Sequence, residues 1–241
     1  MPAPSVGDCA AKMCLVCRNT RFLSFVAAAL LVSGARAQAD VPVYFDNPCK
    51  CENNHAADRL EAKNEWVAVP TNPAMFKRIT PPGIFAWRGL SGVGKHSARK
   101  YPQEQQWCMV TGRVVEVRVQ DDGDVHFELA DATGRKRGRI LAELPLGETW
   151  CDLRTIVFSW TAKGTDFKRF QAGGVLPLRI KPVVTVTGKA FFDVDHAGKN
   201  PLRNRNITHR AGNLAAWEIH PVNAITGDRS LFPNEVLGNH R

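Results

Sequence analysis

Apolar and polar residues alternate in a sustained way only from Trp107 onward. Val125, Phe127 and Leu129 are separated by polar residues, and this period of two predicts a half-buried strand with one polar face. Four other segments have strand-like patterns, and the first of them contains Gly112, where a glycine permits a strong bend. They cover 109–120, 139–144, 182–194 and 214–225, with a less regular stretch at 146–172 that leaves room for a helix at about 155–162.

Five strands with a helix between the third and the fourth follow the order of an OB-fold. We therefore predict a mainly β protein: a five-stranded OB-type barrel with one connecting helix and an irregular N-terminal extension. A different small barrel or an open sheet is the alternative. The barrel domain would span 107–228, followed by a C-terminal tail at 229–241.

The preceding segment, 40–106, lacks this alternation and is rich in Pro, Gly and Asn. One helix is expected within it, at about 55–66. We interpret the segment as an extension of the barrel domain and not as a second full domain. Its aromatic residues are predicted to pack against the barrel, and stacking on a ligand is the alternative. They are Trp66, Phe76, Phe85 and Trp87.

The N-terminus has the pattern of a secretory signal, with Arg18 and Arg21 before an apolar run at 22–32 and small residues after it. The run is shorter than the roughly 18 apolar residues of a membrane-spanning helix. The triplets at 35–37 and 37–39 both fit a signal-peptidase site, so we predict that 1–39 is a signal peptide and that the mature protein is secreted or periplasmic, without a transmembrane segment. A start at Met13 would give a signal of more ordinary length.

Cleavage changes the charge balance of the protein. The whole chain has 32 Lys+Arg and 23 Asp+Glu, and removal of four basic residues and one acidic residue lowers the net charge from +9 to about +6. Such a surplus favours anionic partners, including nucleic acid, phospholipid headgroups or acidic polymers. The alternative is that the charge only keeps the protein soluble.

Four cysteines remain in the mature chain, at positions 49, 51, 108 and 151. An even number in an oxidising compartment predicts two disulfides. Cys49 and Cys51 are too close to pair comfortably with each other, so each is expected to reach Cys108 or Cys151. A four-thiolate zinc site is the alternative, but its usual C-x₂₋₄-C spacing is missing.

Imidazoles and carboxylates recur at positions that strand parity places on one face. Asp124, His126 and Glu128 share the polar side of the second predicted strand, as Glu218 and His220 share that of the fifth. A divalent metal is the cofactor that such a group would hold, with one His or Glu left to activate water. In the alternative, each His only hydrogen-bonds its neighbours and orders the barrel end. The candidate metal ligands are Asp124, His126, Asp193, His196, Glu218 and His220.

Basic residues gather in two predicted loops, the hairpin at 134–138 and the long connection at 195–213. Together they could form the groove of a single-strand binder, with Phe191 or Trp217 as base-stacking platforms, although the alternation favours an inward Trp217. Basic loops are also often just solvated. The candidate ligand-binding residues are Arg135, Lys136, Arg137, Arg203, Arg205 and Arg210.

Several strings are distinctive: VTGR at 110–113, DGDVHFEL at 122–129, VTGKAFFD at 186–193 with His196, and AWEIHPV at 216–222. In these strings the chain resembles a group of uncharacterised exported bacterial OB-fold-like proteins with DGDxH and WEIHPV motifs. The resemblance covers about 107–226 and implies a shared fold and a shared site, but no particular reaction.

Two common catalytic motifs are excluded. The string at 89–97 imitates a phosphate-binding loop, but His96 stands where the Mg²⁺-binding hydroxyl belongs. No G-x-S-x-G nucleophile elbow is present, which argues against a serine hydrolase.

We therefore expect an exported OB-fold binding protein for anionic ligands, with single-stranded nucleic acid as the favoured ligand. The alternative is a metal-dependent hydrolase, either a nuclease or a phosphodiesterase, and the sequence does not decide between binding and catalysis.

Overall fold

The computed structural model describes residues 44–45, 59–99, 101–120, 122–162, 170–171, 174–209 and 211–227. The chain divides into two compact units, Met1–Val41 and Pro42–Arg241, and all described residues belong to the second. The predicted signal peptide, Cys49, Cys51, Arg210 and the predicted C-terminal tail lie outside the described residues.

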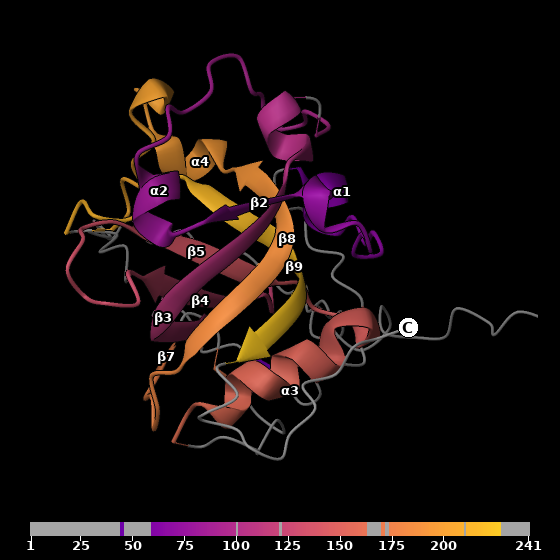
Figure 1. The fold of residues 1–241 in the computed structure, drawn as a ribbon, viewed down its shortest axis with the longest axis vertical. Helices are drawn as coiled ribbons and strands as arrows, with labels where there is room; N and C mark the ends of the chain where they lie inside the picture. Colours follow the sequence, from indigo (N-terminus) through magenta and orange to yellow (C-terminus); the bar gives the residue numbers. More distant parts are fainter. Residues whose placement is uncertain are drawn as a thin grey trace, which may run out of the picture. The chain divides into compact units, whose positions relative to one another are not determined.

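Five strands close a barrel (Figure 1). Antiparallel pairs join β3 to β4, β4 to β5, β8 to β9 and β3 to β8, while β5 pairs with β9 in parallel at Ala142 and Ile219. This strand order confirms the predicted OB-type barrel. The strands are β3 (Trp107–Val119), β4 (Val125–Ala130), β5 (Arg139–Leu144), β8 (Val183–Phe192) and β9 (Trp217–Gly227).

The barrel interior holds the apolar half of each alternating pattern. Val117, Phe127 and Ile219 are fully buried in one hydrophobic cluster with the inward residues of the other strands. Gly112 lies where β3 passes close to other chain segments: a Cβ atom there would be 2.8 Å from the Ala130 carbonyl oxygen. The sequence predicted a glycine that permits a bend at this position, and the structure adds a steric reason for glycine, the close approach of the neighbouring backbone.

One helix connects β5 to β8, as predicted. It is α3 (Cys151–Ser159), preceded by a 3₁₀ turn at Glu148–Trp150, so it begins four residues earlier than expected. The other elements between the barrel strands are short: β6 (Phe170–Gln171), which pairs with β1 (Tyr44–Phe45); β7 (Val175–Leu176), which pairs with β3; α4 (Val194–Ala197); and a 3₁₀ turn at Pro201–Arg203.

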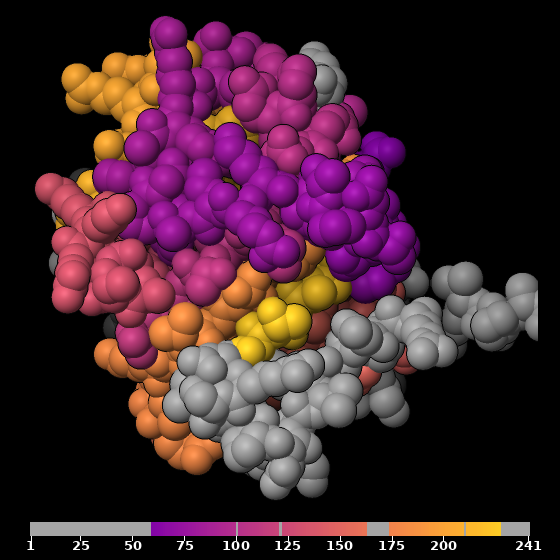
Figure 2. Space-filling model, in the orientation of Figure 1, coloured from indigo at the N-terminus to yellow at the C-terminus, as the bar shows by residue number. Residues whose placement is uncertain are grey.

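The N-terminal extension lies against the barrel and covers part of the face shown in Figure 2. It contributes a strand that the sequence did not predict, β2 (Phe76–Ile79), which pairs in parallel with the start of β3. The predicted helix at 55–66 is a single turn in the described part, α1 (Leu60–Lys63). The remaining elements are 3₁₀ turns at Pro73–Met75 and Pro102–Gln105, and α2 (Pro81–Phe85).

Aromatic residues of the extension pack as predicted. Trp87 meets Trp217 edge to face at 5.5 Å between ring centroids, and Phe76 meets Trp107 at 6.2 Å. Trp66 remains 41% exposed but contacts the Trp150 ring at 5.9 Å. Phe85 is partly buried against the core. These contacts attach the extension to the barrel.

The cysteine prediction is wrong for Cys108. Its side chain points into the barrel core from β3, and it is a free thiol. No cysteine pair is complete within the described residues, because Cys151 is disulfide-bonded and its partner lies outside them. Alternation along β3 could have indicated this outcome, since Cys108 shares the inward parity of Val110.

In the described segments, no helix is both long enough and apolar enough to cross a membrane.

Candidate metal centre

The predicted polar face exists on the outside of β4, β5 and β9. Because Phe127 and Ile219 point inward, His126 and His220 point outward on their strands. This outer face is nevertheless buried: His220 is 0% exposed. The extension reaches over it, since Arg99 donates to the backbone oxygen of His220 and to that of Ala62 in α1.

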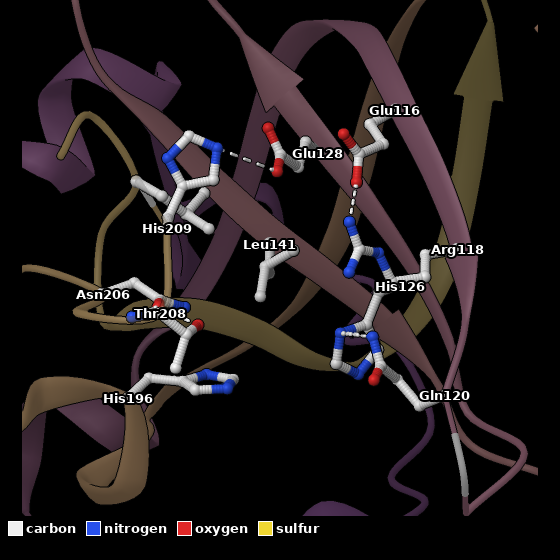
Figure 3. Close-up of a pocket in the computed structure, with 11 residues that line it drawn as sticks. Glu116, Arg118, Gln120, His126, Glu128, Leu141, His196, Asn206, Thr208 and His209 are labelled. Carbon is white, nitrogen blue, oxygen red and sulfur yellow. Dashed lines mark hydrogen bonds and ion pairs between the residues drawn. The ribbon is translucent and has the colours of Figure 1, made fainter. Parts of the chain in front are cut away.

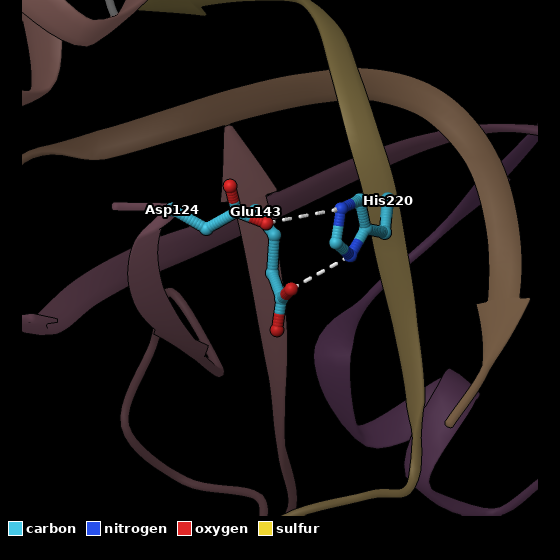
Figure 4. A group of neighbouring side chains, drawn as sticks. All are labelled: Asp124, Glu143 and His220. Carbon is cyan, nitrogen blue, oxygen red and sulfur yellow. Dashed lines mark ion pairs between the residues drawn. The ribbon is translucent and has the colours of Figure 1, made fainter. Parts of the chain in front are cut away.

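Asp124, Glu143 and His220 form a first buried triad (Figure 4). His220 Nδ1 lies 2.6 Å from Glu143 Oε2, and His220 Nε2 lies 3.7 Å from Asp124 Oδ2. Glu143 Oε2 also lies 3.0 Å from His126 Nε2. One ligand atom from each member of the triad lies within 4.8 Å of the other two, which is a separation that one metal ion could bridge.

Glu143 was missed by the sequence analysis. It faces outward from β5 because its neighbours Ala142 and Leu144 point into the core. In the β4–β5 ladder its Cα is paired with that of His126. Pairing the two predicted strands outward from the turn at 131–138 would have placed Glu143 opposite His126. The sequence therefore contained the information needed to find Glu143.

Asp193, His196 and Glu218 form a second triad beside the first. His196 Nδ1 lies 3.3 Å from Asp193 Oδ2 and 3.5 Å from Glu218 Oε1. Asp193 also caps α4, because its Oδ1 accepts from the backbone N–H groups of Asp195 and His196. Glu218 joins the triads, since its Oε2 lies 3.8 Å from His220 Nδ1. The predicted convergence of strand faces and loop therefore occurs.

Burial and mutual repulsion make some of these carboxyl groups hard to ionise. Burial, together with the charges of Asp122 and Glu143, raises the pKa of Asp124 to about 7. Burial also raises the pKa of Glu218 well above its ordinary value, with further contributions from Glu143 and Asp193. We call the two triads together the buried cluster. At neutral pH the metal-free cluster therefore retains protons.

Glu143 behaves in the opposite way. Burial would raise its pKa, but the imidazoles of His126 and His220 outweigh burial and hold the pKa well below its ordinary value. The same contact raises the pKa of His126 despite burial, whereas burial prevails at His220 and lowers its pKa. Glu143 is thus the carboxyl group of the first triad that ionises most readily.

Two cations, the half-buried Lys63 and the buried Arg154, lie near the carboxylates, and the sequence analysis missed both. Lys63 Nζ, from α1, lies 3.9 Å from Asp193 Oδ2. Burial would lower the pKa of Lys63, but the surrounding carboxylates, with Glu143 foremost, outweigh burial and raise the pKa. Arg154 is fully buried and donates to three backbone carbonyls, and burial lowers its pKa to about 10.

A pocket of about 160 Å³ opens beside the cluster (Figure 3). His126 reaches it from the strand side, while His196 and His209 reach it from the long connection after β8. Gln120 Nε2 lies 3.1 Å from His126 Nδ1 and fixes that ring. The other lining residues are Glu116, Arg118, Glu128, Leu141, Asn206, Thr208 and Leu214.

Glu128 does not join either triad. It lies farther along β4, where its Oε2 accepts from Arg139 and its Oε1 lies 3.5 Å from His209 Nε2. The polar residues in and just before β4 therefore have different surroundings. Asp124 belongs to the first triad and Glu128 lines the pocket, while His126 both contacts Glu143 of the triad and lines the pocket.

The described basic candidates lie in the hairpin between β4 and β5 and in the connection after β8. Arg135, Lys136, Arg137 and Arg203 are exposed. Arg205 stacks on Phe85 at 3.6 Å, and its pKa is lowered by burial and by the charge of Arg137. The hairpin and the connection thus bring two guanidinium groups near each other.

The predicted stacking platforms are wrong. Phe191 is 1% exposed and lies beneath the guanidinium of Arg59 at 4.5 Å. Trp217 is 0% exposed in the core, and its Nε1 donates to the Arg88 carbonyl. Neither ring can stack on a nucleic-acid base in this structure.

Comparisons of the chain with protein-family models, with curated proteins and with solved structures find no match. The resemblance to exported OB-fold-like proteins therefore stays a prediction, and arguments about function rest on the geometry of the cluster and the pocket.

Proposed function

We propose that this protein binds a divalent metal ion at Asp124, Glu143 and His220. The observation that carries the proposal is the state of the buried donors. Both oxygens of Glu143 and both ring nitrogens of His220 are sealed from solvent, and they make no hydrogen bond with any described group other than their contacts with each other, with His126 and with Glu218. Such buried polar atoms are costly unless a partner, which can be an ion, satisfies them.

The charge of the cluster supports the same proposal. Four buried carboxylates, from Asp124, Glu143, Asp193 and Glu218, face two cations, the largely covered Lys63 and the buried Arg154. If all four were ionised and the imidazoles neutral, the excess would be two negative charges. Protons on Asp124 and Glu218 offset this excess in the metal-free cluster, and one divalent ion would take their place. Carboxylate and imidazole donors suit Zn²⁺, Mn²⁺ or Fe²⁺ better than Cu⁺, which prefers sulfur ligands.

The pocket is the basis for proposing a hydrolase. It lies on the outer face of the second and third barrel strands beside the loop between the fourth and fifth, and this is where OB-folds commonly bind ligands. Catalysis by a metal needs water or substrate to reach the centre. His126 and His196 line the pocket and also contact the cluster. Water or substrate in the pocket would therefore reach the metal centre by passing between these two side chains.

Metal analysis of the purified protein tests the proposal. We expect at least one Zn²⁺ or Mn²⁺ per chain by plasma mass spectrometry after dialysis, and Mn²⁺-dependent cleavage of bis(p-nitrophenyl) phosphate. His220→Ala should weaken ion binding more than about 100-fold, because loss of an outer partner alone often costs 10–100-fold. His96→Ala, an exposed histidine outside the cluster, is the matched control. Failure of the wild type to retain any divalent ion would refute the proposal.

A second candidate function, binding of single-stranded nucleic acid or another polyanion, is favoured by the contact between the two basic loops: Arg137 of the hairpin donates to the backbone oxygens of Ala211 and Gly212 in the connection that carries Arg205. An anionic ligand would relieve the repulsion between their positive charges. Fluorescence anisotropy with a labelled oligonucleotide tests it: affinity should fall steeply with salt and fall further in the Arg137→Ala, Arg205→Ala double variant. Absence of binding at low ionic strength would exclude this function.

We also propose that the protein is exported, on the strength of the N-terminal basic and apolar pattern. N-terminal sequencing of protein recovered from the periplasm or medium should begin at Gln38 or Asp40. Recovery of the uncleaved chain from the cytoplasm alone would contradict export.

A further inference from the structure

We propose that the cluster binds a second divalent ion at Asp193, His196 and Glu218, and that the Glu218 carboxylate bridges the two ions. The inference rests on the proposed function, because the first ion occupies the site of Asp124, Glu143 and His220. Together the two triads supply four carboxylates and two imidazoles as ligands.

The position of Glu218 is the first reason. Its two oxygens are divided between the triads: Oε1 lies 3.5 Å from His196 Nδ1, and Oε2 lies 3.8 Å from His220 Nδ1. The side chain is 1% exposed, and Oε2 is sealed from solvent beside the Glu143 carboxylate, so a proton or a cation has to lie between the two groups. Glu218 thus presents one oxygen to His196 and the other to the Nδ1 side of His220, where Glu143 also lies, and a carboxylate in this position is placed to bridge one ion in each triad.

The second reason is the state of the other donors. His196 Nδ1 is buried next to two carboxylates, yet it makes a hydrogen bond with no described group. Asp193 uses Oδ1 to cap α4, which leaves Oδ2 directed toward His196. Donor atoms of Asp193, His196 and Glu218 all lie within 4.8 Å of one another, and an ion among them would satisfy each.

The two sites differ in access. Asp124, Glu143 and His220 are all closed to solvent. In the second triad, the side chain of His196 is 25% exposed and lines the pocket. The first ion would therefore be enclosed by protein, while the second would keep a coordination position open toward the pocket. An open position is the feature that separates catalytic from structural metal sites.

Charge then indicates the class of ligand. Two divalent ions balance the four carboxylates, so the charges of Lys63 and Arg154 are left over. A site with this positive balance favours an anionic oxygen donor in the pocket, such as hydroxide or a phosphate ester. Paired ions at about 3.5–4 Å are used in this way to stabilise the attacking and leaving oxygens of phosphate esters.

The stoichiometry of Mn²⁺ binding tests the inference. Native mass spectrometry of the wild type titrated with Mn²⁺ should show two ions per chain, and electron paramagnetic resonance should show the multiline signal of a coupled pair. His196→Ala should retain one ion and lose the coupled signal. His196 is on the pocket wall, so this variant is expected to fold, and circular dichroism checks that it does. His96→Ala, as control, should retain two ions.

The outcomes separate the two proposals. One ion in the wild type, or two ions in His196→Ala, would overturn the second site and leave the first intact. No ion in the wild type would overturn both. If His196→Ala loses its fold, His196→Gln, which preserves size and polarity, takes its place and should likewise bind one ion. Two ions in the wild type and one in the variant would support the bridged pair.

Discussion

His220 Nδ1 lies 2.6 Å from Glu143 Oε2, and both side chains are excluded from solvent. The contact joins the last barrel strand to the third, which pair in parallel. Because the same Glu143 oxygen also lies within 3.0 Å of His126, one carboxylate orders two imidazoles. Loss of the Glu143 charge should therefore affect both His126 and His220.

Glu143→Gln should therefore destabilise the metal-free protein. Removing one partner of a buried ion pair typically costs about 3–5 kcal/mol, because the other partner stays buried without compensation. The pKa of His126 should also fall, since Glu143 is what raises it. Urea unfolding measures the first effect and NMR titration the second. Glu61→Gln, at an exposed position on α1, serves as control. An unchanged His126 titration would contradict the assigned contact.

Asp124 predicts a pH dependence of stability. Its folded-state pKa of about 7 exceeds the ordinary 3.8, so between these values the folded protein holds a proton that unfolding releases. Stability of the metal-free protein should consequently decrease as pH rises from about 4 toward 7. Glu143 has a depressed pKa, and the stability it contributes is lost only at lower pH.

Asp124→Asn isolates this effect, because asparagine does not ionise. As pH increases from 5 to 8, we expect the free energy of unfolding of the variant to rise relative to that of the wild type. Chemical unfolding in EDTA at several pH values provides the comparison. Parallel profiles for the two proteins would show that Asp124 titrates normally.

Metal binding should stabilise the fold. An ion that binds only the native state at 100 times its Kd contributes about 2.7 kcal/mol. Zn²⁺ or Mn²⁺ should therefore raise Tm, and EDTA should lower it again. In His220→Ala the added ion should leave Tm nearly unchanged. Differential scanning calorimetry measures Tm in each of these conditions. If the ion raised the Tm of His220→Ala as much as that of the wild type, the ion would have to bind elsewhere.

Cys108 should be unreactive in the native protein. Burial raises its pKa to about 12, so almost no thiolate forms at neutral pH, and the barrel blocks access. Iodoacetamide should label the Cys108 peptide only after unfolding in guanidinium, as read by mass spectrometry. Rapid labelling of Cys108 without denaturant would argue against its core position.

The sequence predicted the barrel well because strand parity is a local property. The alternation of Val125, Phe127 and Leu129 was enough to predict the outward direction of His126, and the predicted strand order was confirmed. The convergence of Asp124, His196 and His220 followed from that topology. The burial of Asp124 and His220 did not follow, because outward parity on a strand ordinarily means contact with solvent.

What covers this face comes from distant segments. Lys63 belongs to a single helical turn about 130 residues before its partner Asp193, and no local pattern links them. Phe191 looked available for stacking because it too points out of the barrel, yet Arg59 and Arg99 lie over its ring. Long-range packing of this kind is invisible to periodicity.

The contribution of α1 has a consequence for how the protein can be divided. A chain trimmed at Trp107, where the regular strands begin, would lack Lys63, Arg59 and Arg99. Asp193 would then lose its Lys63 partner, and the backbone oxygen of His220 would lose the Arg99 side chain that covers it. The N-terminal extension is therefore part of the polar centre, and the shortest unit that keeps this centre intact begins no later than Arg59.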